Sequence, residues 1–352
     1  MTGPLSRQRQ AVSGKGGASL RSLGGKLPVV AVSLLTAVAV AAVTAGIVRA
    51  ISPGRPSAPA YPGGSFRDHP VIITLPASPN SYIGAFVHGV PASYAPMQSF
   101  ATTTGVQPNI ALYYSGWGEP FQTRFARQAT EHHAIPLVQM EPGKTSLAAI
   151  AGGVYDGFIQ SYANAVAKFG AQTGQGVIIG FAHEPNGSWY PWGVGHADPA
   201  VWVAAWQHVV TVFRQQGADN VTWLWTVNII DTHGRARIPA PDPWWPGSGY
   251  VTWVGIDGYY YKPTWTFASL FGPTIRAVRG LTRDPVLISE TGAAPAAGKP
   301  AKIGDLFAGI RAYGLLGLVW FDANRVRDWR INTAAAASRF HREAQAYHKP
   351  GG

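Results

Sequence analysis

The sequence predicts an α/β fold of the (β/α)8 (TIM) barrel class. Eight short apolar runs lie between residues 82 and 322, and helical patterns separate most of them. Most runs are continuously apolar rather than alternating, which is typical of parallel strands buried on both faces. Eight such strands spread over roughly 270 residues favour a closed barrel. A doubly wound open sheet is the alternative, but the first run lacks the glycine-rich phosphate loop that would support it.

The expected strands follow one another at fairly even intervals along the chain. They are YIGAFV (82–87), NIALYYSGW (109–117), IPLVQMEP (135–142), GVIIGFAHE (176–184), VTWLWTVN (221–228), WVGIDGYYY (253–261), PVLISETG (285–292) and LGLVWFD (316–322). In a barrel these runs would form one parallel sheet that closes on itself.

The expected helices lie between these runs. The clearest has Asp198 as N-cap, Pro199 at the first helical position and Gly217 as a stop signal. Its apolar residues are spaced by four, three and four positions: Trp202, Trp206, Val209 and Phe213. Similar patterns cover residues 121–133, 155–170, 267–280, 302–314 and 334–348.

The region before the barrel divides into three segments. Residues 1–26 form a basic tail, and Leu27–Val48 is a run of 22 residues without a charge. At ~1.5 Å per residue such a helix spans about 33 Å, enough for the ~30 Å hydrocarbon core of a membrane. Basic residues before it favour a cytoplasmic start and an exported body. We therefore expect a transmembrane anchor, with a cleaved signal sequence and secretion as the alternative.

A Pro- and Gly-rich linker over residues 49–80 then leads to the expected catalytic domain at 81–349. The formal charge of +11 is concentrated at the N-terminus, because residues 1–60 hold seven basic residues and no acid. The remainder has 21 basic against 17 acidic residues, or about +4, which argues against nucleic-acid binding. The chain has no cysteine, so disulfides and thiolate metal sites are excluded.

Acidic residues follow several of the expected strands, at the barrel end where active sites gather. A carboxylate at the end of an apolar run costs desolvation energy, so each has a helix cap, a salt bridge or a function to explain it. Glu184 and Glu290 stand at the ends of the fourth and seventh runs. Two facing carboxylates suit glycosidic bond cleavage, since one must protonate the leaving group and the other must stabilise or capture positive charge.

Aromatic residues follow Glu184 in the loop GFAHEPNGSWYPWG (180–193). Their flat faces and polar edges match a sugar, which has apolar C–H faces and a rim of hydroxyls. A single tryptophan more often packs in a core, but Trp189 and Trp192 lie in a Gly- and Pro-punctuated loop. We therefore expect these two rings to line a substrate cleft.

Several segments resemble glycoside hydrolase family 26, the family of many β-mannanases. HEPNGSWYPWG (183–193) resembles its acid/base segment, VGIDGYY (254–260) its sixth strand and LISETG (287–292) its nucleophile strand. GVQPNIALYYSGWGEPF (105–121) and IPLVQMEP (135–142) resemble its second and third strands, so the similarity spans roughly residues 80–345. Pro185 and Met140 depart from the residues common at those positions, which are Met and an aromatic.

This resemblance implies a retaining glycosidase with Glu184 as acid/base and Glu290 as nucleophile. It assigns Tyr259 as a partner of the nucleophile, Trp320 as a sugar platform and His183 as a contact of the acid/base or the substrate. The full set of expected substrate-binding residues is His183, Asn186, Trp189, Trp192, Asp257, Tyr259 and Trp320. No metal or other cofactor is expected, since His132 and His133 close a helix without HExxH spacing.

The sequence thus predicts an exported, monomeric hydrolase that is held at the membrane with its catalytic domain outside the cytoplasm. Its expected partner is a polysaccharide, cleaved at internal β-linkages, mannan-type first. A β-1,4- or β-1,3/1,4-glucanase and a non-catalytic carbohydrate-binding protein on the same fold are the alternatives.

Overall fold

The computed structural model describes residues 72–231, 238–294 and 298–347. The expected basic tail, the uncharged run Leu27–Val48 and most of the linker lie outside the described residues. Within the described part of the chain, none of the helices combines the length and the apolar character needed to cross a membrane.

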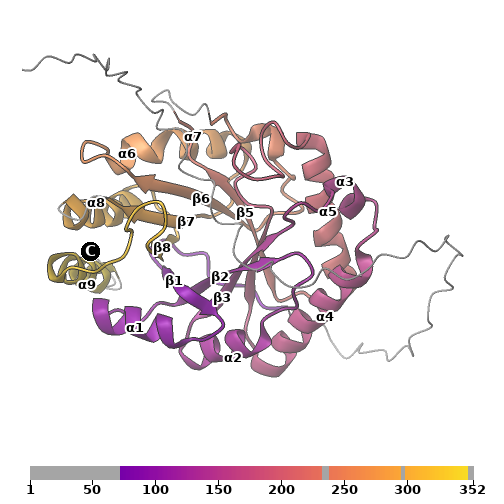
Figure 1. Ribbon diagram of the computed structural model, residues 1–352, viewed down its shortest axis with the longest axis horizontal. Coiled ribbons are helices and arrows are strands. Elements are labelled where there is room, and N and C mark those ends of the chain that lie inside the picture. The colour runs from indigo at the N-terminus through magenta and orange to yellow at the C-terminus, as the bar shows by residue number, and fades with distance from the viewer. Residues whose placement is uncertain (1–71, 232–237, 295–297, 348–352) are drawn as a thin grey trace, which may run out of the picture.

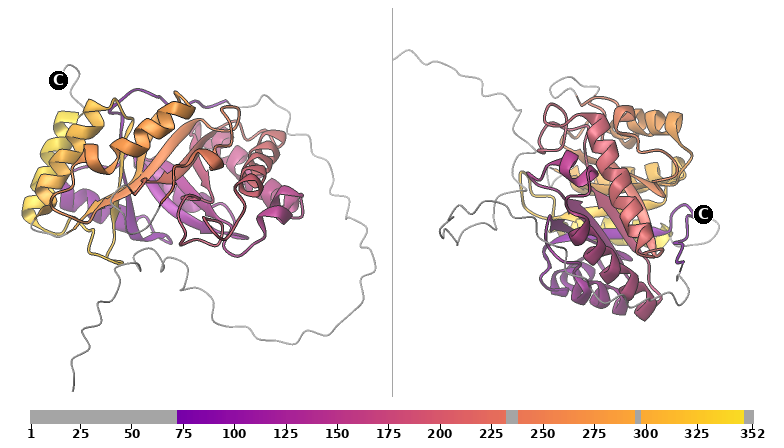
Figure 2. Two further views of the ribbon diagram at one scale, coloured as in Figure 1. Left: turned by 90° about the horizontal axis from the view of Figure 1, so that it is seen from above. Right: turned by 90° about the vertical axis from the view of Figure 1, so that its right-hand side faces the viewer.

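The described strands form a closed parallel barrel in chain order, with each strand paired to the next and β8 paired back to β1. Figure 1 shows the helices arranged around this sheet, and Figure 2 shows the same ring in two further views. The strands are β1 (Tyr82–Pro91), β2 (Ile110–Gly116), β3 (Ile135–Glu141), β4 (Val177–Phe181), β5 (Val221–Asn228), β6 (Trp253–Tyr260), β7 (Val286–Ala293) and β8 (Gly317–Asp322). The barrel that the sequence predicts is therefore confirmed.

The helical elements follow the strands in turn. They are α1 (Ala95–Thr104), α2 (Thr123–Glu131), α3 (Leu147–Ala151), α4 (Asp156–Thr173), α5 (Pro199–Gln215), the 3-10 turn η1 (Asp242–Trp244), α6 (Phe267–Leu270), α7 (Gly272–Leu281), α8 (Lys299–Ala312) and α9 (Ala334–Tyr347). The sequence pattern does not predict α1, because only Met97, Phe100 and Thr104 face the core and three threonines end it. Threonine is a weak helix former.

Two apolar layers hold the barrel together. One lies inside it, where Tyr82 of β1 meets Trp253 of β6 with ring centroids 5.1 Å apart. The other lies between the strands and the helices, where for example Trp202 and Trp206 of α5 are fully buried. Alternate strand residues supply the two layers, as the two-residue period of a strand requires.

Strand β7 departs from this alternation. Between two register pairs, Gly255–Leu287 and Asp257–Glu290, β7 has one more residue than β6. The pairing with β8 shifts over the same stretch, between Ile288 and Thr291. An extra residue of this kind is a β-bulge, which re-aims the side chain beside it. The bulge lets the consecutive residues Ser289 and Glu290 both face the carboxyl end of the barrel interior.

Candidate active site

Glu184 lies in a turn beyond the end of β4 rather than on the strand. Ala182 and Glu184 have φ angles of 47° and 53°, the left-handed region that residues other than glycine rarely adopt. Such residues cost about 1–3 kcal/mol each and persist only where surrounding structure holds them. Here the backbone N–H of Glu184 donates to the Thr226 carbonyl at 2.9 Å. The expected fourth strand therefore ends earlier than its apolar pattern indicates.

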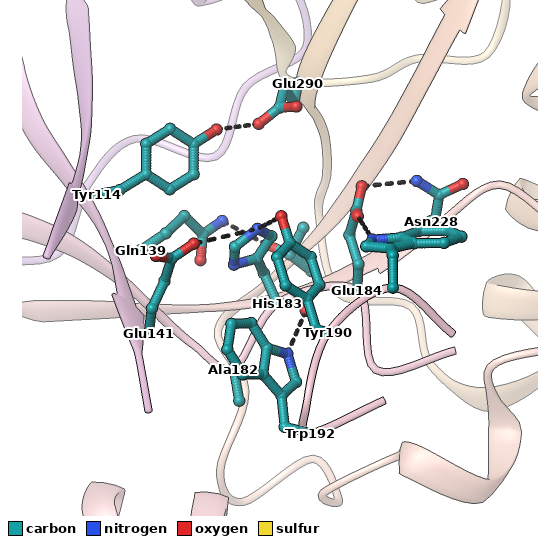
Figure 3. Close-up of polar contacts among 12 residues, drawn as sticks. Tyr114, Gln139, Glu141, Ala182, His183, Glu184, Tyr190, Trp192, Asn228 and Glu290 are labelled. Carbon is teal, nitrogen blue, oxygen red and sulfur yellow. Dashed lines mark hydrogen bonds and ion pairs between the residues drawn. The ribbon is translucent and has the colours of Figure 1, made fainter. Parts of the chain in front are cut away.

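Glu184 is almost completely buried, with 6% of the residue's surface exposed. Asn228 Nδ2 donates to its Oε1 at 2.6 Å, and Trp189 Nε1 donates to its Oε2 at 2.6 Å. Figure 3 shows Asn228 and Glu184 facing each other at this end of the barrel. Burial and the charge of Glu290 raise the pKa of Glu184 to about 8, although the two donors act to lower it. The group is therefore held in its acid form near neutral pH.

The Glu290 carboxylate accepts hydrogen bonds from two phenol hydroxyls. Tyr114 donates to Oε2 and Tyr259 donates to Oε1, so each carboxylate oxygen has its own donor. Burial raises the pKa of Glu290, while both tyrosines and Arg325 lower it. Hydrogen bonds from uncharged donors favour the ionised form of a carboxyl group. Glu290 is thus the better supported anion of the two.

A third carboxyl group lies beside this pair. Asp257 is 1% exposed, and Ser289 Oγ donates to its Oδ1 at 2.6 Å. Burial, followed by the charges of Glu290 and Glu184, holds the pKa of Asp257 well above its usual range. A protonated Asp257 adds no further negative charge to a site that already contains two glutamates.

His183 lies on the β3 side of the site. It is 2% exposed, and burial lowers its pKa to about 3, so the imidazole is neutral. Its Nε2 lies 2.9 Å from the Tyr190 hydroxyl and 4.0 Å from Glu141 Oε1, contacts that Figure 3 shows. Burial and the charge of Glu290 raise the pKa of Glu141 to about 7.

Contacts within the loop after Glu184 fix its conformation. Trp192 Nε1 donates to the His183 carbonyl at 2.8 Å, and its ring stacks on Tyr190 with centroids 4.4 Å apart. A Cβ on Gly193 would lie 2.0 Å from the Gly187 carbonyl oxygen, so only glycine fits there. Trp189 stays partly exposed. The loop therefore fixes Trp189 against Glu184.

Three of the expected substrate contacts are buried in the structure. Trp320 is 1% exposed and packs outside the barrel against Phe340 of α9, because its place on β8 points away from the interior. Asn186 is fully buried, and its side chain bonds both the N–H and the carbonyl of Asn228. Trp192 is 3% exposed and supports His183 from behind. Trp320 therefore offers no face to the barrel interior, whereas the roles of Asn186 and Trp192 as substrate contacts stay predictions.

Four further residues of the site are not among those that the sequence predicts: Tyr114, Glu141, Asn228 and Trp329. Glu141 and Asn228 end their strands and Tyr114 lies two residues before the end of β2, which is the signal that could have identified them. Trp329 lies beyond β8, and its ring is 4.6 Å from that of Tyr259. Nothing in its local sequence distinguishes it from Trp320. Among the described residues, no cluster of three or more metal-ligating side chains is present.

Residues 126–307, from α2 to α8, match the sequence model of glycosyl hydrolase family 26. The chain belongs to this family. Family 26 enzymes cleave glycosidic bonds, and the matched region contains both Glu184 and Glu290. The resemblance that the sequence motifs indicate is thereby confirmed.

A curated relative and several solved structures are similar to this chain. Endoglucanase H of Acetivibrio thermocellus is 30% identical over 278 residues, which cover 74% of this chain. This chain spans only 30% of that relative's length. A family 26 β-mannanase of Bacteroides ovatus superposes with a TM-score of 0.58 at 14% identity, covering 76% of this chain and 89% of its own. Mannanase BCman of Bacillus subtilis gives 0.55 at 16%, covering 75% and 85%. These structures share the fold.

Proposed function

We propose that this family 26 member hydrolyses internal β-linkages of a polysaccharide, with Glu184 as acid/base and Glu290 as nucleophile. The observation that carries the proposal is the contrast between the two carboxyl groups. Burial and the charge of Glu290 keep Glu184 protonated, with a pKa of about 8. Each carboxylate oxygen of Glu290 accepts a hydrogen bond from one tyrosine hydroxyl. Adjacent carboxyl groups whose surroundings favour opposite protonation states are what acid and nucleophile roles require.

The proposed reaction proceeds in two displacements. In the first, a Glu290 oxygen bonds to the anomeric carbon, the glycosidic C–O bond breaks, and the departing oxygen takes the Glu184 proton. The ester removes the Glu290 charge, so the pKa of Glu184 falls. Glu184 then accepts a proton from water as the water oxygen attacks the anomeric carbon. The Glu290 ester bond breaks, and both carboxyl groups return to their starting states with the anomeric configuration retained.

The proposed substrate is a β-linked polysaccharide, with mannan first. Mannan comes first because HEPNGSWYPWG (183–193) resembles the acid/base segment of family 26 β-mannanases, and the solved structures described as mannanases share this fold. A β-glucan is the second candidate, since the relative at 30% identity bears the name Endoglucanase H. Mannose and glucose differ in whether the 2-hydroxyl is axial or equatorial, so each sugar needs a different hydrogen-bond partner there. A few contacts around Glu290 therefore decide between the two sugars.

Incubation with mannan, β-1,4-glucan, β-1,3/1,4-glucan and xylan, followed by sizing of early products, tests this proposal. We expect mixed oligosaccharides from one of the first three polymers, and none from the Glu290→Gln protein. Early release of only mono- or disaccharide would contradict internal cleavage. Binding to a polymer without turnover would support the carbohydrate-binding alternative instead.

Export of the catalytic domain is a separate proposal that rests on the uncharged run Leu27–Val48 and the basic residues before it. Membrane fractionation of cells that make the full chain, with protease added outside, is the test. Anchoring predicts a membrane-bound chain that external protease can cut. A soluble product whose N-terminus lies just after the run would identify a signal sequence, and an intact cytoplasmic chain would refute export.

A further inference from the structure

Tyr114 reaches the nucleophile from across the barrel. It lies on β2, whereas Glu290 lies on β7, and the strand order places β8 and β1 between them. Its hydroxyl donates to Glu290 Oε2, and Figure 3 shows the two side chains pointing at each other. Tyr259 comes instead from the neighbouring strand β6 and donates to Oε1. The two oxygens of one carboxylate are therefore held from opposite directions.

The ring of Tyr114 is fixed independently of Glu290. On one side its edge meets Phe86, with centroids 5.2 Å apart, and Phe86 in turn stacks on Phe321 at 4.7 Å. On the other side it lies 5.6 Å from the His183 ring, directly before the proposed acid/base. These contacts set the place of the hydroxyl before any substrate arrives, and such preorganisation is what gives a donor its catalytic value.

We propose that Tyr114 is a positioning residue for the nucleophile, which fixes the Oε2 side of the Glu290 carboxylate while Tyr259 fixes the Oε1 side. The inference rests on the proposed function and deepens it. The terminal torsion of a glutamate is broad, so a single donor leaves the carboxylate plane free to rotate. Two donors on separate oxygens define that plane, and with it the line along which an oxygen can approach the anomeric carbon.

The charge of Glu290 gives this role a measurable signature. Both phenol bonds favour the anion, which exists in the free enzyme and disappears when the ester forms. The other groups that interact with Glu290 include Glu184, Asp257 and Glu141, which carry or could carry negative charge, the Tyr261 phenol, and Arg325, which lowers the pKa of Glu290. Loss of the Tyr114 hydroxyl leaves these groups in place, so any change in the ionisation of Glu290 comes from the missing donor.

The test is the pH dependence of kcat/KM for the Tyr114→Phe protein on the polysaccharide that the wild type cleaves. We expect kcat/KM to fall roughly tenfold to a hundredfold, as for loss of a hydrogen bond to a charged group. We also expect its acidic limb to move to higher pH. Tyr113→Phe is the matched control, because Tyr113 is the preceding residue and packs outside the barrel against Phe125. Its profile should match the wild type.

An unchanged Tyr114→Phe profile, or a fall in activity without movement of the acidic limb, would overturn the positioning role while leaving the proposed function intact. If the wild type cleaves no glycan, the proposed function fails and a second measurement decides the inference. Carboxyl ¹³C signals of glutamate-labelled protein, with Glu290 assigned through Glu290→Gln, would be titrated. Tyr114→Phe should move the Glu290 titration to higher pH, and an unmoved titration would refute the inference.

Discussion

Glu184 and Glu290 are the same residue type at the same end of one barrel, yet the chain positions them by different means. Glu184 stands beyond β4 in a left-handed turn and receives N–H donors from Asn228 and Trp189. Glu290 stands within β7 at a bulge and receives O–H donors from Tyr114 and Tyr259. Each location uses a break in regular backbone geometry to aim a carboxyl group that an ideal strand would direct elsewhere.

The difference shows how surroundings separate two like groups. Both receive two donors, so donor count alone cannot decide which group stays protonated. Burial and the charge of Glu290 outweigh the donors at Glu184 and raise its pKa to about 8. At Glu290, Arg325 joins the tyrosines in opposing the effect of burial. The assignment of acid and nucleophile therefore depends on net charge around each group, and variants at each location test it.

The largest expected effect on activity comes from substitution of Glu290 in β7. Glu290→Ala removes the atom that would form the glycosyl bond, so kcat should fall by about 10⁴-fold or more, as for loss of other covalent nucleophiles. The fall should be similar for every substrate, whatever its leaving group. Steady-state rates on the polysaccharide and on an aryl glycoside measure it. A variant with near-normal activity would remove Glu290 from the chemistry.

The β4 location should respond differently, because its role changes between the two steps. Glu184→Ala should lower turnover of the polysaccharide by roughly 10²–10⁴-fold, the usual contribution of a general acid. An aryl glycoside with a very good leaving group needs no proton, so its first step should survive and the second should stall. Added azide should then restore turnover and give a glycosyl azide of retained configuration, visible by NMR. An inverted product would contradict the double displacement.

A smaller effect should follow from changing the donors of Glu184. Asn228→Ala removes a hydrogen bond that favours the Glu184 carboxylate, so the pKa of Glu184 should rise further above about 8. Glu184 acts first as an acid, and activity is lost as pH increases through its pKa. The basic limb of kcat/KM should therefore move to higher pH, with a loss of about tenfold from poorer alignment.

Trp189→Phe should move the same limb in the same direction, since it removes the second donor. Asn164→Ala on the outside of α4 is a suitable control, because its exposed amide donates to Gln216. Movement of the acidic limb instead would mean that Asn228 and Trp189 act on Glu290, and the distinction between the two locations would fail.

The barrel and the two glutamates could be predicted from the sequence because both depend on local pattern. Continuous apolar runs mark strands buried on both faces, and their ends mark where polar side chains meet. The error at Trp320 arises because a long-range arrangement decides which way that residue points. The side of β8 that Trp320 occupies, outside the barrel, depends on strand register. Apolar spacing alone does not show that register for a strand with two buried faces.

Tyr114 illustrates the same limit from the other direction. Its strand end is visible in the sequence, but its partner lies 176 positions away across a closed sheet. The bulge in β7 is equally hidden, since it is a mismatch of count between neighbouring strands and not a property of the segment LISETG. Contacts of this kind appear only once the barrel has closed.

The smallest expected effect concerns stability, and it compares the two locations directly. A carboxyl group whose pKa rises from 4.5 in the unfolded chain to about 8 in the folded one makes the folded state bind more protons between those values. Stability is therefore lost as pH rises from 4.5 through 8. Glu184→Gln abolishes this loss, and a flipped Asn228 amide could accept from the new side chain. Its Tm should exceed the wild type by about 2–6 °C at pH 9, with little difference at pH 4.5.

The Tm of Glu290→Gln should exceed that of the wild type by a smaller amount over the same pH range. Its folded-state pKa is also raised, but the substitution gives up two hydrogen bonds from Tyr114 and Tyr259 that are stronger to an anion than to an amide. Thermal melts of the three proteins from pH 4.5 to 9 measure both differences. If the Tm gain of Glu184→Gln does not change with pH, burial of the Glu184 charge does not destabilise the folded protein. A larger gain at Glu290 would reverse the proposed assignment of the better supported anion.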